Sequence, residues 1–182
     1  MNKLYIAENV GGGLLVNFLP QLPQSYIQMK LKNVEVVHNY LVEDDDRRRY
    51  GFVVRFEKGV INPGGVYISL ESVEISNNVL VFEDESTWNQ QLFLDLETNC
   101  ALTIMNTEVH FKQTKLFNNS MPAVLGYNSD LHFHEVNVFK NNSGRQCGGA
   151  LVLRMNSQMY LHGGTQVYIL GNTALKYGGG IP

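Results

Sequence analysis

Acidic side chains that could bind a cation gather in two short stretches of the chain. The first, EDDDRRR, covers residues 43–49, and the second, EDE, covers residues 83–85. Carboxylate oxygens are the ligands that Ca²⁺ prefers. The candidate ligands are therefore Asp44, Asp45, Asp46, Glu83, Asp84 and Glu85. Three arginines follow the first run directly, and charge runs are usually solvated. We expect two solvated loops and assign no metal to them.

Histidines offer a second set of metal ligands. His132 and His134 are two residues apart in LHFHE. In a strand, this spacing points both imidazoles to one face of the sheet, and histidine is a common metal ligand. A zinc site needs three or four ligands, and the sequence does not fix the register of His110, which lies one segment earlier. We therefore expect no metal and no cofactor here.

Glutamates recur in a way that raises the question of catalysis. Similar positions in successive segments hold Glu35, Glu74, Glu108 and Glu135, which we expect to form a ladder along one sheet. Glycoside hydrolysis needs two carboxylates a few ångströms apart in different environments. One glutamate per segment is what repetition alone produces, and there is no Ser–His–Asp set, phosphate loop or cysteine with a clear base. We assign no catalytic residue.

Composition bounds the class of protein. The chain has 182 residues, is 44% hydrophobic and 17% charged, and carries a net charge of −3. This suits one domain, residues 1–182, without the basic surface that a nucleic-acid partner requires. No apolar run reaches the ~20 residues of a membrane-spanning helix, and the N-terminus has no apolar core of a secretory signal. Abundant Val, Ile, Tyr, Phe and Thr predict an all-β fold.

An asparagine recurs three residues after an apolar residue, and predicted strands follow each copy in the same order. The copies end at Asn9, Asn39, Asn78, Asn119, Asn142 and Asn172. After a turn comes a first strand: GLLVNF from residue 13, GFVVRF from 51, QLFLDL from 91, AVLGY from 123 or ALVLR from 150. Two more strands precede the next asparagine; in the third segment they are CALTI from residue 100 and EVHFKQTKLFNN. Fixed strands with loops of varying length indicate a solenoid.

Three short strands per repeat predict a parallel β-helix of about five coils. Each coil adds one strand to each of three parallel sheets, with ~4.8 Å between neighbours. The repeated asparagine is expected at a corner with positive φ, which Asn tolerates well, and stacked amides can bond along the column. An antiparallel sandwich also has short strands, but its turns would not bring the same asparagine motif back at the same place in every repeat.

Two segments resemble a known repeat. FKNNSGRQCGGAL (139–151) and ILGNTALKYGGGI (169–181) are similar to the polymorphic outer membrane protein repeat, which pairs Phe-x-x-Asn with Gly-Gly-Ala-Ile/Leu/Val. The similarity covers about 120–182 and 4–14 well, and 30–120 loosely. It implies a right-handed parallel β-helix displayed outside the cell, often with an adhesive role.

Both ends of the chain interrupt the repeat. Residues 178–181 begin a sixth coil, and LYIAEN closes a coil whose start is absent. We expect an uncapped fragment of a longer array, with its signal peptide upstream. Asn118 and Asn141 each begin an Asn-x-Ser triplet and are candidate N-glycosylation acceptors. Such acceptors agree with an extracellular or cell-surface location.

These features predict a non-enzymatic repeat segment that acts as a structural spacer or as an adhesive, ligand-binding surface. Its partner would be a protein or glycan at the cell surface, and no nucleic acid. The alternative is a carbohydrate-active β-helix enzyme, such as a polysaccharide lyase or glycoside hydrolase, or an inactive relative of one. Strand tyrosines such as Tyr160 and Tyr168 are expected to pack across coils rather than to bind sugars.

Overall fold

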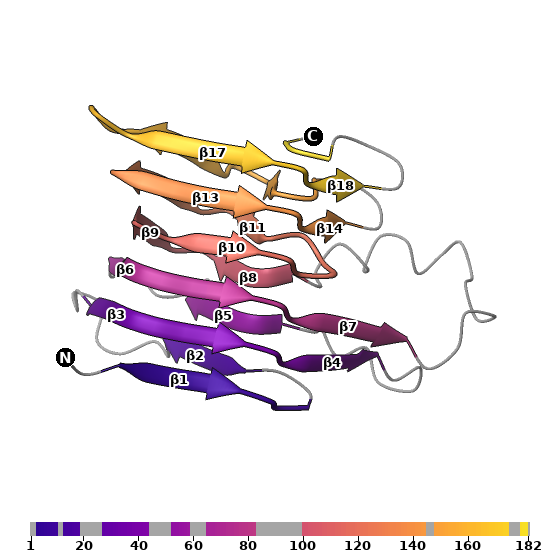
Figure 1. The fold of residues 1–182 in the computed structure, drawn as a ribbon. Coiled ribbons are helices and arrows are strands. Elements are labelled where there is room, and N and C mark those ends of the chain that lie inside the picture. Colours follow the sequence, from indigo (N-terminus) through magenta and orange to yellow (C-terminus); the bar gives the residue numbers. More distant parts are fainter. Residues whose placement is uncertain are drawn as a thin grey trace.

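A computed structural model describes residues 3–10, 13–18, 27–43, 52–58, 65–82, 100–144, 148–174 and 179–181. Every regular element in these ranges is a β-strand, and the strands pair in parallel and lie in stacked layers (Figure 1). The described residues include no helix long and apolar enough to cross a membrane. The prediction of an all-β chain of parallel strands is thus confirmed.

One sheet takes a single strand from each of five layers. In stacking order these are β2 (Leu14–Phe18), β5 (Phe52–Lys58), β8 (Cys100–Met105), β11 (Val124–Tyr127) and β15 (Leu151–Arg154). The position of β8 corrects the sequence-based assignment, because CALTI is the first strand of its layer rather than the second. The segment QLFLDL, predicted to be that first strand, lies outside the described residues.

A second, nine-stranded sheet covers two sides of each layer. In the early layers β3 (Ile27–Val37) and β6 (Val66–Ser76) each run across both sides, and β1 (Leu4–Ala7) pairs with the later half of β3. Later layers use two short strands instead: β9 (Glu108–Lys112) and β10 (Lys115–Phe117), β12 (Asp130–His134) and β13 (Val136–Lys140), β16 (Gln158–Leu161) and β17 (Gln166–Leu170). The segment EVHFKQTKLFNN, predicted to be one strand, is therefore two.

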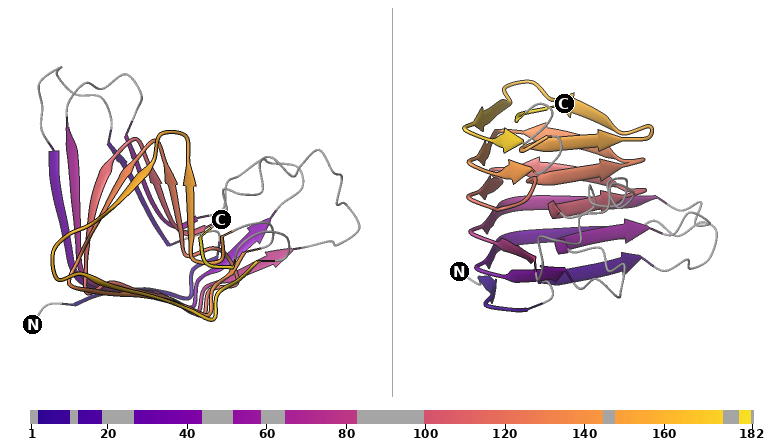
Figure 2. Two further views of the ribbon diagram at one scale, coloured as in Figure 1. Left: turned by 90° about the horizontal axis from the view of Figure 1, so that it is seen from above. Right: turned by 90° about the vertical axis from the view of Figure 1, so that its right-hand side faces the viewer.

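A left-handed residue makes the bend between these two sides. Asn33 and Ser72 have φ of 56° and 53°, and Gln113 and Glu135 have φ of 53° and 58° at the same corner. Two small pairs extend beyond the next corner: β4 (Tyr40–Glu43) with β7 (Val79–Phe82), and β14 (Ser143–Gly144) with β18 (Thr173–Ala174). Seen along the stack, the layers superpose on a three-sided outline (Figure 2).

The core fills the inside of this outline because apolar side chains alternate along the strands. In LHFHE, Leu131 and Phe133 point inward and are fully buried. Phe111 stacks on Phe133 with ring centroids 4.8 Å apart, and Phe139 meets Phe133 edge to face at 5.8 Å. Burying one such side chain stabilises the fold by roughly 1.5–3 kcal/mol.

The close approach of neighbouring backbone explains why a glycine, Gly149, stands just before β15. A Cβ on Gly149 would lie 2.4 Å from the carbonyl oxygen of Thr173 and 2.6 Å from that of Gly179. No other residue fits there without moving backbone. The carbonyl oxygen of Gly180 accepts hydrogen bonds from the backbone of Ala150 and Leu151, both at 3.2 Å. Residues 179–181 thus lie against β15.

Candidate functional site

The repeat asparagines form one continuous line of amides, which we call the asparagine column: Asn9, Asn39, Asn78, Asn119, Asn142 and Asn172. Each Nδ2 donates to the Oδ1 of the next asparagine at 2.8 to 3.0 Å. That same oxygen also accepts the backbone N–H of the preceding asparagine. Every layer is thereby bonded to the next by side chains as well as by strands.

The column also explains the three-residue spacing of the motif. The Nδ2 of Asn78 donates to the carbonyl oxygen of Val36, and that of Asn119 to the carbonyl oxygen of Ile75, at 3.2 and 3.1 Å. Each acceptor is the apolar residue of the motif one layer earlier. The four inner asparagines are at most 1% exposed, so these bonds satisfy amides that water cannot reach.

The left-handed corner lies one residue earlier than the sequence predicts. Positive φ, between 54° and 60°, occurs at Glu8, His38, Asn77, Asn118, Asn141 and Gly171, each directly before a column asparagine. The prediction that the repeat asparagine itself takes this conformation is wrong. A bend just before it turns its side chain to the inside, where the amide can bond to both neighbouring layers.

The two predicted glycosylation acceptors stand in a second line of amides on the outside of the same corner. Asn118 donates to Asn77, and Asn141 donates to Asn118, each at 3.3 Å. Asn118 and Asn141 are both exposed. A glycan on either Nδ2 would point away from the core, and their modification stays a prediction.

Four of the five histidines of the chain meet on the outer surface of the β9, β12 and β16 side. We call this surface the histidine face, formed by Glu108, His110, His132, His134, Tyr160 and His162. His110 is the register partner of His132, which is in turn the partner of Tyr160. The alternation that buries Leu131 and Phe133 turns His132 and His134 outward, as their spacing predicts.

Short contacts link the rings of the histidine face. His110 Nδ1 lies 2.9 Å from His134 Nε2, and His132 Nδ1 lies 3.0 Å from His162 Nε2. The rings of His110 and His132 stack with centroids 4.5 Å apart, and those of His134 and His162 with centroids 4.1 Å apart. Each nitrogen pair needs one N–H donor and one lone-pair acceptor, so the acceptor imidazole of each pair must be uncharged.

Partial burial lowers the pKa of two of these imidazoles. For His132, burial is the main cause, followed by repulsion from His110, while the charge of Glu108 acts the other way. For His134, burial again leads, followed by repulsion from His162 and His110. Both groups therefore hold their lone pairs at neutral pH more readily than an exposed histidine does.

Three groups on this face could hold a metal ion together. Glu108, His110 and His132 each offer one ligand atom, all within 4.8 Å of one another. Sequence reasoning missed this set because it left the register of His110 open; aligning EVHFK with DLHFH would have revealed it. The acidic candidates in the loops at 44–46 and 83–85 lie outside the described residues.

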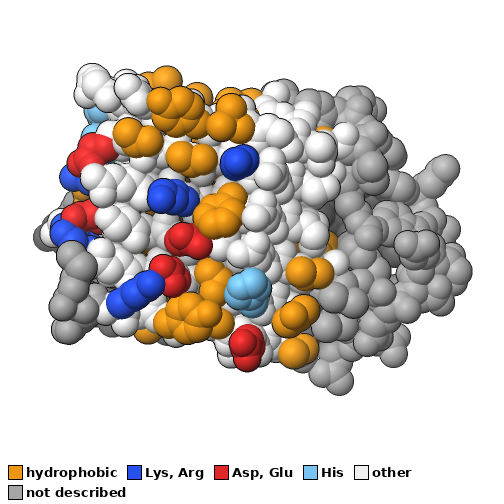
Figure 3. Space-filling model, in the orientation of Figure 1, with side chains coloured by type: hydrophobic (Ala, Val, Ile, Leu, Met, Phe, Trp, Pro, Cys, Tyr) orange, Lys and Arg blue, Asp and Glu red, His pale blue; other side chains and the backbone are white. Residues whose placement is uncertain are grey.

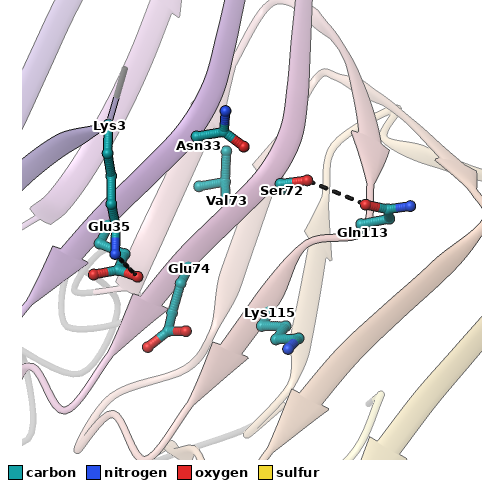
Figure 4. A pocket seen from close by; sticks show the side chains of 8 residues that line it. All are labelled: Lys3, Asn33, Glu35, Ser72, Val73, Glu74, Gln113 and Lys115. Atoms are coloured by element: carbon teal, nitrogen blue, oxygen red, sulfur yellow. Dashed lines mark hydrogen bonds and ion pairs between the residues drawn. The ribbon is translucent and has the colours of Figure 1, made fainter. Parts of the chain in front are cut away.

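The predicted glutamate ladder holds for only two of its four members. Glu35 and Glu74 are register partners on β3 and β6, and both line a shallow hollow with Lys3 and Lys115 (Figure 4). Lys115 takes the next position of the ladder. Glu108 lies on another side, in register with Tyr67, because the third layer starts later than predicted. Glu135 lies at the bend, three residues before Val138, which holds the next position of the ladder.

Both carboxylates of this hollow have cationic or hydroxyl partners. Lys3 Nζ lies 2.5 Å from a Glu35 oxygen, and the Ser76 hydroxyl donates to Glu74 at 2.9 Å.

The chain matches no protein-family model, no curated protein and no solved structure. The chemistry of its surface is therefore the basis for assigning a function.

Proposed function

We propose that the chain is a segment of a right-handed parallel β-helix of the polymorphic outer membrane protein repeat type, serving as a rigid extracellular or cell-surface spacer with an adhesive face. Stacked parallel layers on a three-sided outline support the architecture. The hand follows the strong general preference for right-handed crossovers between parallel strands. The motifs at 139–151 and 169–181 support the kinship.

The asparagine column is the observation that carries the spacer role. Its amides run through every layer from Asn9 to Asn172 without a break. Each of the four inner amides bonds to the layer on either side, so a layer cannot slip or tilt without breaking buried hydrogen bonds. Leaving such groups unpaired costs about 1–3 kcal/mol each. A stack held in this way transmits its shape along its length, as a spacer must.

Exposed apolar and aromatic side chains on the outer surfaces support the adhesive role. Tyr160 and Tyr168 are 38% and 44% exposed, and Val136 and Leu170 are 45% and 48% exposed. Apolar groups alternate with charged groups over the surface of the β1 to β17 side (Figure 3). Tyr160 stacks on His132 of the neighbouring layer, as expected of a strand tyrosine, and both tyrosines still keep exposed surface for contact with a ligand. A regular surface of this kind suits many weak contacts with a protein or glycan.

Binding and turnover assays on the same sample test this proposal. We expect the chain to bind a subset of glycans or cell surfaces in an array, and Tyr160→Ala with Tyr168→Ala to reduce the signal at least threefold. Incubation with pectin, alginate and other acidic glycans should release no product. Reducing ends or unsaturated sugars would favour a polysaccharide lyase or glycoside hydrolase instead. A chain that binds no surface component would leave the spacer role without its adhesive part.

A further inference from the structure

Three ligand groups on the histidine face converge on one spot. Glu108 Oε1 lies 2.7 Å from His110 Nε2 and 3.6 Å from His132 Nε2. Donors of a tetrahedral zinc site, with bonds of ~2.0 Å, lie ~3.3 Å apart, which falls between these separations. We propose that Glu108, His110 and His132 bind one divalent transition-metal ion of the Zn²⁺ class. This site is independent of the spacer role.

The remaining nitrogens of the two ligand histidines have partners that suit metal binding. If Nε2 of His110 and His132 binds the ion, Nδ1 of each ring carries the proton. His110 Nδ1 then donates to His134 Nε2, and His132 Nδ1 donates to His162 Nε2, over 2.9 and 3.0 Å. Metal-binding histidines usually donate their second N–H in this way, which fixes the tautomer and the ring orientation.

The donor chemistry of the three groups also suits a metal ion. A histidine must be neutral to bind a metal, so metal and proton compete for the same lone pair. A carboxylate beside two imidazoles gives the mixed oxygen and nitrogen donors that suit Zn²⁺, Cu²⁺ or Ni²⁺.

Binding requires a modest change in the side chains. The rings of His110 and His132 are within 6° of parallel, whereas a bound ion lies in the plane of each imidazole. The two rings must therefore tilt toward a common point beside Glu108. Glu108 is 47% exposed, which leaves room for this adjustment. The fourth coordination position then faces solvent and takes a water molecule or a ligand from a partner.

Calorimetric titration of the EDTA-treated and desalted chain with ZnCl₂ at pH 7.5 tests the site. We expect Glu108→Gln and His132→Asn each to weaken Zn²⁺ binding at least tenfold. His134→Asn removes only a hydrogen-bond partner, and about a tenfold loss is expected for such outer partners. His38→Asn is the matched control, because His38 stands at the far corner in a left-handed conformation that Asn accepts; its affinity should not change.

A second readout separates coordination from loss of folding. Co²⁺ in place of Zn²⁺ should give the visible absorption of a four-coordinate site in the wild type and lose it in Glu108→Gln. Glu108→Gln keeps the size of an exposed side chain, and thermal melting in EDTA should match that of the wild type. Zn²⁺ affinity that is absent in the wild type, or unchanged in both Glu108→Gln and His132→Asn, would overturn the proposal.

Discussion

The asparagine column and the histidine face are both ladders of like polar side chains in successive layers, yet they differ in chemistry. The column is buried, and its inner amides are bonded within it. The histidine face is partly open to solvent; the side chains of His110 and His132 are 13% and 16% exposed. Repetition of the layers lines up the side chains of both ladders. Their burial then determines whether they bond only to one another or can also bind protons and ions from solvent.

The comparison shows that neutral amides suit buried positions, whereas imidazoles suit positions that solvent can reach. An amide has both donors and acceptors, so one asparagine per layer can pass hydrogen bonds through the stack without any charge. An imidazole gains a proton or a metal near neutral pH, which is possible only where solvent and ions reach it. The column is therefore structural, and the face is the surface that can respond to its surroundings.

Removing one amide from the column should give the largest effect. Asn119→Ala takes away the acceptor of the Asn78 backbone and side chain, and the donor to Ile75. Buried polar groups left unpaired cost about 1–3 kcal/mol each, so we expect a loss of about 3 kcal/mol in the free energy of unfolding. Urea denaturation measures it.

Asn118→Gly is the matched control for that substitution. It removes only the outer amide contacts, and glycine takes the positive φ of this residue without strain. We expect a loss of less than about 1 kcal/mol, because exposed hydrogen bonds are replaced by water. Equal losses in the two variants would mean that the buried column is no more important than the outer line of amides.

A change in pH should alter the stability contributed by the histidine face and not that contributed by the asparagine column. Because the folded pKa values of His132 and His134 are lowered, the unfolded chain binds more protons near pH 6. Stability from these groups is complete above their unfolded pKa of ~6.5 and falls as the pH drops toward the folded values. Chemical denaturation of the metal-free chain between pH 7.5 and 5 should show this decline.

A double variant assigns the decline to the right groups. Glu108 and Asp130 oppose the shift of His132, and Lys112 adds to that of His134. Replacing both histidines, as His132→Asn with His134→Asn, should flatten the profile over this range. A decline that keeps its full slope in the double variant would place the titrating groups elsewhere.

Neutralising Glu71 should give the smallest effect. Hydrogen bonds from Lys30 and Lys32 lower the pKa of this carboxyl to about 2, and the three side chains form a surface ion-pair cluster beside the histidine face. Such pairs are screened by water and salt. Glu71→Gln should leave the midpoint of urea denaturation at pH 7 within experimental error; a clear loss that disappears in 1 M NaCl would contradict this.

The column follows directly from the repeated motif, whereas the histidine face also requires a choice of register, which the alignment of EVHFK with DLHFH supplies. The Φ-x-x-Asn spacing, where Φ is apolar, follows from hydrogen bonds between consecutive layers, so it survives changes in loop length. The register of His110 with His132 depends on where the third layer begins. A long stretch precedes Cys100, and either QLFLDL or CALTI satisfies the apolar pattern of a first strand. Strand pattern alone cannot choose between them.

Regular stacking of the layers is the central claim, and distances between spin labels on the outer corner test it most directly. Labels would replace Glu8, His38, Asn118 and Asn141 in a Cys100→Ala, Cys147→Ala background. Glu8–Asn118 and His38–Asn141 both span three layers, so their mean distances should agree. Glu8–Asn141 should be longer by one layer, ~4.8 Å. Unequal three-layer distances, or a four-layer distance no longer than these, would contradict the stack.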